Sequence, residues 1–135
     1  MKNPESIQRY RLNAEAVLRR YKDEDLPAFC GIELTDVNQR GLFGERPLDV
    51  AACRGDVDEI LALLEGGAYI DAPGEHGFTA LHEAVMQGHA AAVKLLLDFG
   101  ARRDLKNDWG KTAMDVACDP DVCAVLNSHS SDGCR

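Results

Sequence analysis

The sequence repeats itself with a period of 33 residues. Three stretches align without a gap, and they begin at Gly44 (GERPLDVAACRG), Gly77 (GFTALHEAVMQG) and Gly110 (GKTAMDVACDPD). Farther along each unit, LLEGGAYID, which ends at Asp71, aligns with LLDFGARRD, which ends at Asp104. A fixed period of this length is typical of proteins in which each repeat stacks only on its neighbours. The register therefore indicates a stacked repeat protein rather than a globular enzyme.

The sequence of each unit predicts two short helices after a glycine-containing turn. The first helix is rich in small residues (PLDVAAC, ALHEAVM and AMDVAC), and Gly55 or Gly88 ends it. The second is more apolar (VDEILALLEG and AAAVKLLLDF), and Gly67 or Gly100 follows it where a C-terminal cap belongs. Two such helices cannot bury their apolar faces alone, so neighbouring units must stack. The fold class that we predict is all-α.

These motifs resemble ankyrin repeats, whose pattern is a turn, then T-P-L-H-x-A-A-x-x-G-H, and later L-L-x-x-G-A. The second unit matches closely through residues 79–84 (TALHEA), 88–89 (GH), 96–97 (LL) and 100–101 (GA). The first unit has Arg46 and Asp49 in place of the threonine and the histidine, and the third has Met114 in place of the leucine. The resemblance covers residues 36–127. It implies an all-α solenoid of helix-turn-helix units with hairpin-like turns.

The expected domain organisation has three parts. Residues 1–35 form an N-terminal capping helix, over residues 4–21, and a linker; a basic docking helix or nucleic-acid arm is the alternative for this segment. The repeats follow as residues 36–70, 71–103 and a truncated 104–127, in which the sequence DPD (119–121) replaces the usual loop and the second helix shrinks to about residues 122–126. Residues 128–135 are expected to be a mobile polar tail.

The charge is unevenly distributed along the chain. The net charge is −8, yet residues 1–22 carry six basic and only two acidic side chains, and no lysine or arginine lies between Arg54 and Lys94. An acidic body repels nucleic acid and anionic lipid and favours a partner with a basic surface, or it serves only as a solubilising face. No apolar run reaches the roughly 18 residues of a membrane span, and the N-terminus lacks a signal-like stretch. We expect a cytoplasmic protein whose five cysteines are free thiols, two or three of them in the core.

Possible chemical sites are few. His82, Glu83 and His89 superficially resemble a metalloprotease motif, but the histidines are seven residues apart and Gly88 separates them. The family resemblance instead gives His82 a role in loop hydrogen bonding and His89 a role in packing at a helix start. Cys118, Cys123, His129 and Cys134 follow no common zinc spacing. We predict no catalytic, cofactor-binding or metal-binding residue, so that an enzyme or metal protein is only a second alternative.

The resemblance implies a partner-binding surface on the concave side, formed by hairpin tips and first helices. Each tip carries a large aromatic residue, namely Phe43, Phe78 or Trp109, which either forms a row of contacts or folds back onto the repeats. The predicted partner-binding residues are Arg40, Leu42, Phe43, Glu45, Arg54, Glu75, His76, Phe78, Met86, Gln87, Asp108, Trp109 and Lys111.

The predicted function is that of a protein–protein interaction module, a monomer or one half of a 1:1 complex, that needs no cofactor. The more specific hypothesis is an inhibitor or immunity protein for a basic partner such as a toxin enzyme. The first alternative is a structural or assembly subunit that forms homo-oligomers.

Overall fold

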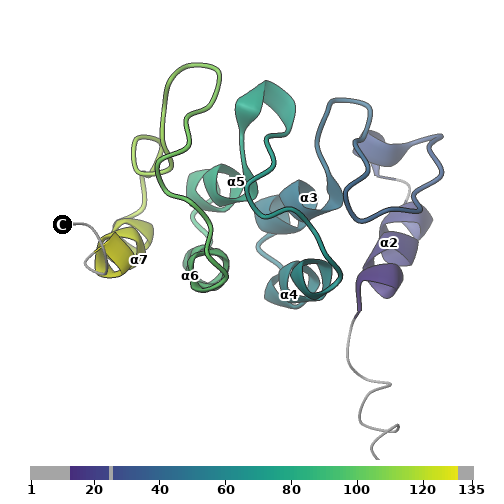
Figure 1. Ribbon diagram of the computed structural model, residues 1–135, viewed down its shortest axis with the longest axis horizontal. Helices are drawn as coiled ribbons and strands as arrows, with labels where there is room; N and C mark the ends of the chain where they lie inside the picture. Colours follow the sequence, from purple (N-terminus) through teal and green to yellow (C-terminus); the bar gives the residue numbers. More distant parts are fainter. Residues whose placement is uncertain (1–12, 25, 131–135) are drawn as a thin grey trace, which may run out of the picture.

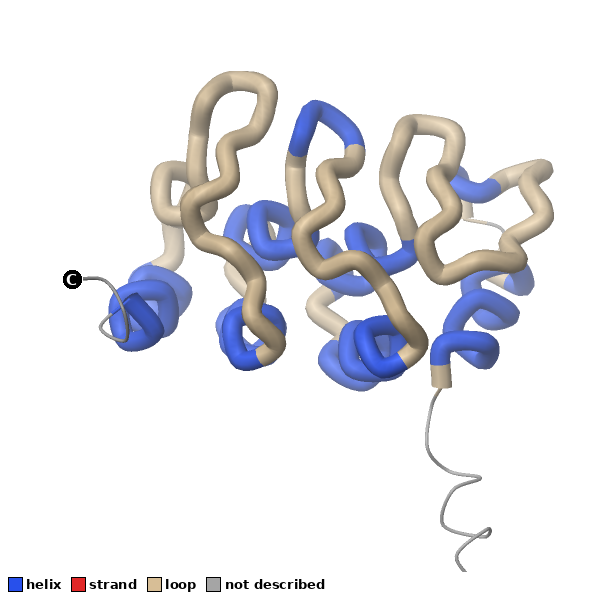
Figure 2. The backbone as a smooth tube through the Cα atoms, viewed as in Figure 1, coloured by secondary structure: helices blue, strands red, loops and turns tan. Residues whose placement is uncertain are grey.

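The computed structural model describes residues 13–24 and 26–130, and these form two helix pairs in a row with a single helix at each end (Figure 1). The α-helices are α2 (Ala14–Asp23), α3 (Pro47–Arg54), α4 (Val57–Glu65), α5 (Ala80–Met86), α6 (Ala90–Asp98) and α7 (Pro120–Ser130). Two 3-10 turns, η1 (Pro27–Phe29) and η2 (Glu75–Gly77), lie in the loops. The described residues contain no strand, and Figure 2 shows long loops rising side by side above the helices. The prediction of an all-helical solenoid is confirmed.

The start of each first helix follows from its local sequence. Pro47 is the first residue of α3, where its fixed φ suits a helix and its missing N–H costs nothing. The Asp49 carboxylate accepts a hydrogen bond from the Arg46 backbone N–H at 3.0 Å. In α5 the same position is His82, whose Nδ1 accepts from the Thr79 backbone N–H at 3.2 Å. Both helices thus begin with a side chain that satisfies a backbone donor at the helix start.

The two helices of a repeat meet at a glycine that must have a left-handed conformation. Gly55 follows α3 with φ +72°, which a residue with a side chain rarely adopts. A Cβ at this position would also collide with the ring of His89, whose Nε2 lies 3.0 Å from the Cys53 carbonyl oxygen. The predicted role of His89 in packing at a helix start is therefore confirmed.

Adjacent repeats stack helix on equivalent helix. The first helices α3 and α5 lie side by side, as do the second helices α4 and α6. Alanines line the contact between the first helices, where Ala51, Ala52 and Ala84 are completely buried. Larger side chains such as Ile60, Leu63, Val93 and Leu96 fill the core between the second helices. The layer of first helices is thus packed with small residues and the layer of second helices with larger, branched ones.

Helix α2 covers the exposed end of the first repeat by packing on α4. Its Val17 and Tyr21 side chains are fully buried, and the Asn13 side chain caps its first turn by accepting from the Ala16 backbone N–H. The helix ends at Asp23, two residues beyond the predicted end. The predicted N-terminal part, residues 4–12, lies outside the described residues.

A buried carboxylate joins α2 to the first repeat. Glu59 of α4 has no exposed surface, and its two oxygens accept from the Tyr21 hydroxyl at 2.6 Å and from Arg20 at 2.8 Å. Arg54 lies 3.8 Å from the same carboxylate and forms a second ion pair with Glu24 at 2.8 Å. A buried charge is tolerated only when it is paired and hydrogen-bonded, and Glu59 meets both conditions.

The third repeat is truncated, but in a different place from the one predicted. Residues 113–116 form only a turn, so the first helix is missing, whereas α7 is longer than the second helices of the other repeats. Pro120 accounts for the start of α7, because it suits the first turn of a helix and disfavours a helical residue 119. The Asp119 carboxylate accepts from the Asp121 backbone N–H at 2.8 Å. The predicted helix over residues 122–126 is present, but the prediction that it is shortened was wrong, since α7 runs from Pro120 to Ser130.

The C-terminal boundary and the cysteines also differ from the predictions. Helix α7 extends through Ser130, so residue 128 is helical rather than the start of a tail, and residues 131–135 lie outside the described residues. The described cysteines are not core residues: Cys30, Cys53 and Cys118 are exposed and Cys123 is half-buried. Alanine, valine and leucine fill the core in their place. In the part of the chain that the structure describes, no helix has both the length and the apolar content needed to cross a bilayer.

Candidate partner-binding surface

The three hairpin tips present equivalent positions in a row along one edge of the molecule (Figure 1). Phe43, His76 and Trp109 are 33 residues apart and occupy the same place in successive tips. All three are exposed, with 55% of the Phe43 surface and 61% of the Trp109 surface accessible. The row of exposed rings is therefore Phe43, His76 and Trp109. Phe78, which we expected to be part of it, lies two positions later in its tip and is half-buried.

One backbone hydrogen bond joins the third tip to the second, and another hydrogen bond orders the third tip itself. The Asp108 backbone N–H donates to the His76 carbonyl at 3.0 Å, and the Asn107 side chain accepts from the Trp109 backbone N–H at 2.9 Å. The Trp109 ring lies 5.1 Å from the His76 ring and 5.8 Å from the Phe78 ring, measured between centroids. Trp109 thus rests on two rings of the neighbouring tip while its outer face stays exposed. Such a ring is ordered before any partner arrives, which lowers the entropic cost of binding.

The first tip is tied to the N-terminal part of the chain. The Leu42 backbone N–H donates to the Ala28 carbonyl at 2.7 Å, and the Glu45 carboxylate accepts from the Phe43 backbone N–H at 3.1 Å. Arg40 reaches the second tip, where it donates to the Pro73 carbonyl at 3.4 Å. Leu42 and Phe43 nevertheless keep more than half of their surface exposed. The first tip therefore presents two apolar side chains on a fixed backbone.

A groove lies between the tips and the first helices. It has a volume of about 300 Å³, and the residues that line it are Leu26, Glu45, Asp49, Val50, Cys53, Arg54, Glu75 and Glu83. Four of the eight are acidic, and they come from two tips and two helices. Sequence reasoning found Glu45, Arg54 and Glu75 but missed Asp49 and Glu83, since these belong to the repeat framework.

The acidic groups of the groove affect one another. Burial raises the pKa of Asp49 to about 7, and its backbone hydrogen bond from Arg46 only partly opposes this shift. Burial also raises the pKa of Glu83 to about 6, with further contributions from the negative charges of Glu75 and Glu45. The single basic residue lining the groove, Arg54, is already paired with Glu24 at 2.8 Å. The groove therefore concentrates negative charge that these described contacts do not neutralise.

The sequence register and the stacked helices agree with a family comparison. A family model described as "Ankyrin repeats (3 copies)" matches residues 16–107 and 48–134. The chain belongs to the ankyrin-repeat family. Ankyrin repeats are protein–protein interaction modules that bind other proteins, and the family is generally non-enzymatic.

Curated relatives share this array as a small part of much longer proteins. SH3 and multiple ankyrin repeat domains protein 2 of Homo sapiens is 39% identical over 98 residues, which are 68% of this chain and 5% of that protein. BCL-6 corepressor-like protein 1 of Homo sapiens is 35% identical over 97 residues, or 72% of this chain and 5% of that protein. Ankyrin repeat and SOCS box protein 16 of Mus musculus is 39% identical over 75 residues, covering 56% of this chain and 16% of that protein. The chain thus spans about one twentieth of the first two relatives.

The other predicted contact residues of the ankyrin array lie in the tips and at the ends of the first helices. Met86 and Gln87 are exposed at the end of α5, and Asp108 and Lys111 are exposed in the third tip. Glu75 is exposed beside His76, with 3.5 Å between its carboxylate and His76 Nε2. The predicted residues thus lie in the tips and at the ends of the first helices, and Phe78 is half-buried.

The histidines of the possible metal motif have structural roles. Since His82 Nδ1 accepts from the Thr79 backbone N–H, Nε2 carries the proton and donates to the Lys111 carbonyl at 3.0 Å. Burial lowers the pKa of His82, which keeps the ring neutral for this pair of bonds. The predicted loop hydrogen bond of His82 is confirmed. Within the described ranges no three histidine, cysteine or acidic side chains lie so that they could hold a metal ion; Cys134 and the side chain of His129 lie outside what the structure describes.

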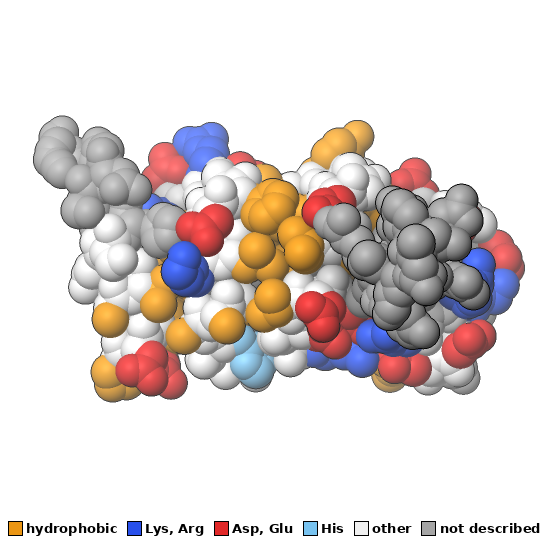
Figure 3. Space-filling view, turned by 90° about the horizontal axis from the view of Figure 1, so that it is seen from below, with side chains coloured by type: hydrophobic (Ala, Val, Ile, Leu, Met, Phe, Trp, Pro, Cys, Tyr) orange, Lys and Arg blue, Asp and Glu red, His pale blue; other side chains and the backbone are white. Residues whose placement is uncertain are grey.

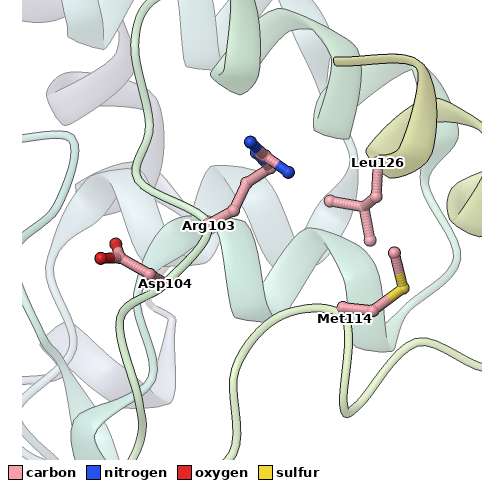
Figure 4. A pocket seen from close by; sticks show the side chains of 4 residues that line it. All are labelled: Arg103, Asp104, Met114 and Leu126. Carbon is pink, nitrogen blue, oxygen red and sulfur yellow. The ribbon is translucent and has the colours of Figure 1, made fainter. Parts of the chain in front are cut away.

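A second cavity, of about 480 Å³, lies at the C-terminal end of the stack, where the third repeat lacks its first helix. Figure 4 shows Met114 and Leu126 pointing toward each other and Arg103 reaching toward the same space, while Asp104 points away. Figure 3 shows the molecule from below, on the side opposite the tips, with apolar side chains gathered in the middle of that face. Sequence reasoning also missed exposed Tyr69 and Phe99, which follow α4 and α6.

Proposed function

We propose that this ankyrin array binds a protein partner across its hairpin tips and the groove beneath them. The observation that carries the proposal is the ordered, exposed Trp109 ring, which rests on His76 and Phe78 and forms a row with Phe43. Aromatic side chains supply a large share of the energy at protein interfaces, and a preordered ring loses little entropy on binding.

The charges favour a partner with a basic surface. The groove combines four acidic residues with one arginine that is already paired, and the chain has a net charge of −8. A partner of opposite charge would be attracted over a distance, so the association rate should fall as salt is added. Nucleic acid and anionic membranes would be repelled by the same charges.

The specific role that we propose is inhibition. A partner whose basic active site is covered by the tips and the groove is blocked without any chemistry in the ankyrin array. A toxin enzyme that acts on nucleic acid would have a surface of this kind, because its substrate is anionic. Exposed free thiols at Cys30, Cys53 and Cys118 favour a reducing compartment, and the compartment that we propose is the cytoplasm. The state that we propose is a monomer or a 1:1 complex with the partner.

The experiment compares Trp109→Ala with Tyr69→Ala, a change of another exposed aromatic residue that lies outside the tips. Both proteins and the wild type serve as bait in native lysate, and captured proteins are quantified by mass spectrometry. We expect Trp109→Ala to lose a partner that the wild type and Tyr69→Ala retain, while circular dichroism shows the same helical content. Equal capture by all three baits would refute the assignment of the tip surface.

Two further measurements test the finer points. Binding of the captured partner should weaken as the salt concentration rises from about 50 to 500 mM, because counterions screen exposed charges. Affinity that does not depend on salt would contradict a basic partner. Light scattering of the purified protein decides between the proposed monomer and the alternative of a homo-oligomeric assembly subunit.

A further inference from the structure

We infer that the groove between the tips and the first helices receives a single arginine side chain from the partner. This inference rests on the proposed function, because it assumes that a protein covers the concave side. It adds the chemistry of one anchor residue and the place where that residue binds. The occupant follows from the size of the groove, its apolar surface and its charge.

The size and lining of the groove suit one long side chain. A volume of about 300 Å³ is at the lower end of the range for small-molecule pockets. Leu26, Val50 and Cys53 contribute apolar surface, on which the methylene groups of a long side chain can pack. A whole helix would not fit, whereas a side chain that projects from a segment lying across the tips would. Exposed Leu42 and Phe43 on the adjoining tip would contact the rest of that segment.

The carboxylates converge on this space from separate elements. Glu45 and Glu75 come from the first and second tips, and Glu83 comes from α5. The Glu83 side chain has no hydrogen-bond or ion-pair partner among the described residues, and the only partner of the Glu75 side chain there is His76, at 3.5 Å. Negative charge from different directions, with an apolar surface below, is complementary to a cation on an aliphatic stem.

The arrangement favours arginine over lysine. A guanidinium group has five donors in a planar fork and can bind carboxylates on two sides at once. An ammonium group presents a compact, strongly hydrated charge, which gains less from carboxylates that lie on separate walls. Replacing the anchor arginine of the partner segment with lysine keeps the charge. We nevertheless expect this change to weaken binding.

Binding of the cation should release protons. The groups that face Glu83 are Glu45 and Glu75 on the tips and Asp49, Cys53 and Arg54 on α3. Because burial and like charges raise the pKa of Glu83 to about 6, a bound guanidinium would lower it again. Affinity should therefore rise between about pH 5 and pH 7.5, as Glu83 loses its proton first and Asp49, with a pKa of about 7, loses its proton next.

The test uses three blocked tripeptides, Gly-Arg-Gly, Gly-Lys-Gly and Gly-citrulline-Gly, titrated into the isotope-labelled protein and followed by amide chemical shifts. Citrulline keeps the shape of arginine without the charge. We expect saturable shifts at α3 and α5 with the arginine peptide at millimolar concentration, weaker binding of the lysine peptide, and none of the citrulline peptide. Shifts that are equal for arginine and lysine, or absent for all three, would overturn the inference.

Two variants with the same change in charge give the control. Glu83→Gln should weaken binding of the arginine peptide by about five- to tenfold, as expected for a lost charge-assisted contact. It should also remove the lower-pH part of the pH dependence and leave the part near pH 7 that belongs to Asp49. Asp58→Asn, on the exposed surface of α4 outside the groove, should leave binding unchanged. Equal weakening by both variants would show general attraction to an acidic protein and would overturn the site. Because Trp109 is not in the groove, loss of partner capture on Trp109→Ala would uphold the proposed function even if the groove failed this test.

Discussion

Replacing Tyr21 with phenylalanine tests how α2 is held on the first repeat. The change removes one hydroxyl, which donates to the buried Glu59 carboxylate at 2.6 Å. The ring itself can stay in place, stacked on Phe29 with 6.3 Å between centroids and covered by the Arg54 guanidinium at 5.3 Å. The variant therefore isolates a single hydrogen bond to a charge that has no contact with solvent.

The expected loss of stability follows from the surroundings of Glu59. A hydrogen bond to a charged group contributes about 1.5–3 kcal/mol, and the acceptor cannot turn to water because Glu59 is 0% exposed. Arg20 remains at 2.8 Å and keeps the charge paired, so we expect about 2 kcal/mol rather than the full cost of an isolated buried charge. Burial and the bond to Glu59 raise the pKa of Tyr21 far above its ordinary value, so that the hydroxyl remains a donor at every pH of interest.

Urea unfolding followed by circular dichroism measures this loss. With a typical dependence on urea, about 2 kcal/mol lowers the midpoint by about 1 M. Tyr69→Phe is the matched control, since Tyr69 is 65% exposed and the same atom is removed. In a Glu59→Gln background the cost of Tyr21→Phe should fall to about 1 kcal/mol, because the acceptor is then neutral. A midpoint within about 0.2 M of the wild type for Tyr21→Phe would refute the reasoning.

Two further predictions concern the first repeat. The pKa of Asp49 is raised to about 7 in the folded state, whereas the unfolded state releases this proton near the ordinary pKa of 3.8. The contribution of the bound proton to stability is therefore lost as the pH rises toward 7. Urea titrations between pH 4.5 and pH 8 should show Asp49→Asn gaining stability relative to the wild type as the pH rises, and a constant difference would contradict the shift. Gly55→Ala should lower the free energy of unfolding by about 2 kcal/mol or more in thermal unfolding, since alanine is strained at φ +72° and its Cβ meets the His89 ring. The control is Gly67→Ala, which is also at positive φ but has nothing near the added Cβ, so that only the strain should appear.

The sequence was sufficient for the fold because the period itself encodes the stacking. Gly55, Gly88 and the leucines of the second helices recur at fixed positions, and each has a local reason to be there. The register also contained the row of tip positions, since Phe43, His76 and Trp109 are 33 residues apart. We placed Phe78 in the row because it is aromatic, whereas the residue at the equivalent position of the second tip is His76. Only the structure shows that Phe78 packs against His82, with 5.8 Å between the ring centroids.

The features that could not be predicted depend on contacts between distant residues. Nothing in the sequence pairs Tyr21 with Glu59, which are 38 residues apart and lie on a helix outside the repeats and a helix within them. The acidic groove needs two loops to fold over two helices before Glu45, Glu75 and Glu83 come together. In the third repeat Pro120 was visible, but a proline can end one helix or begin the next, and the choice depended on how α7 packs on α6.

The single-helix end of the stack determines how the molecule could be lengthened. A 33-residue unit added after Ser130 would meet α7 but would find no first helix on which to stack its own. Duplicating residues 71–103 in place would instead insert a complete repeat between two complementary neighbours and leave both ends unchanged. It would also add a second copy of the His76 tip and widen the row of rings by one position. An extra unit is therefore better accommodated between the complete repeats than beside α7.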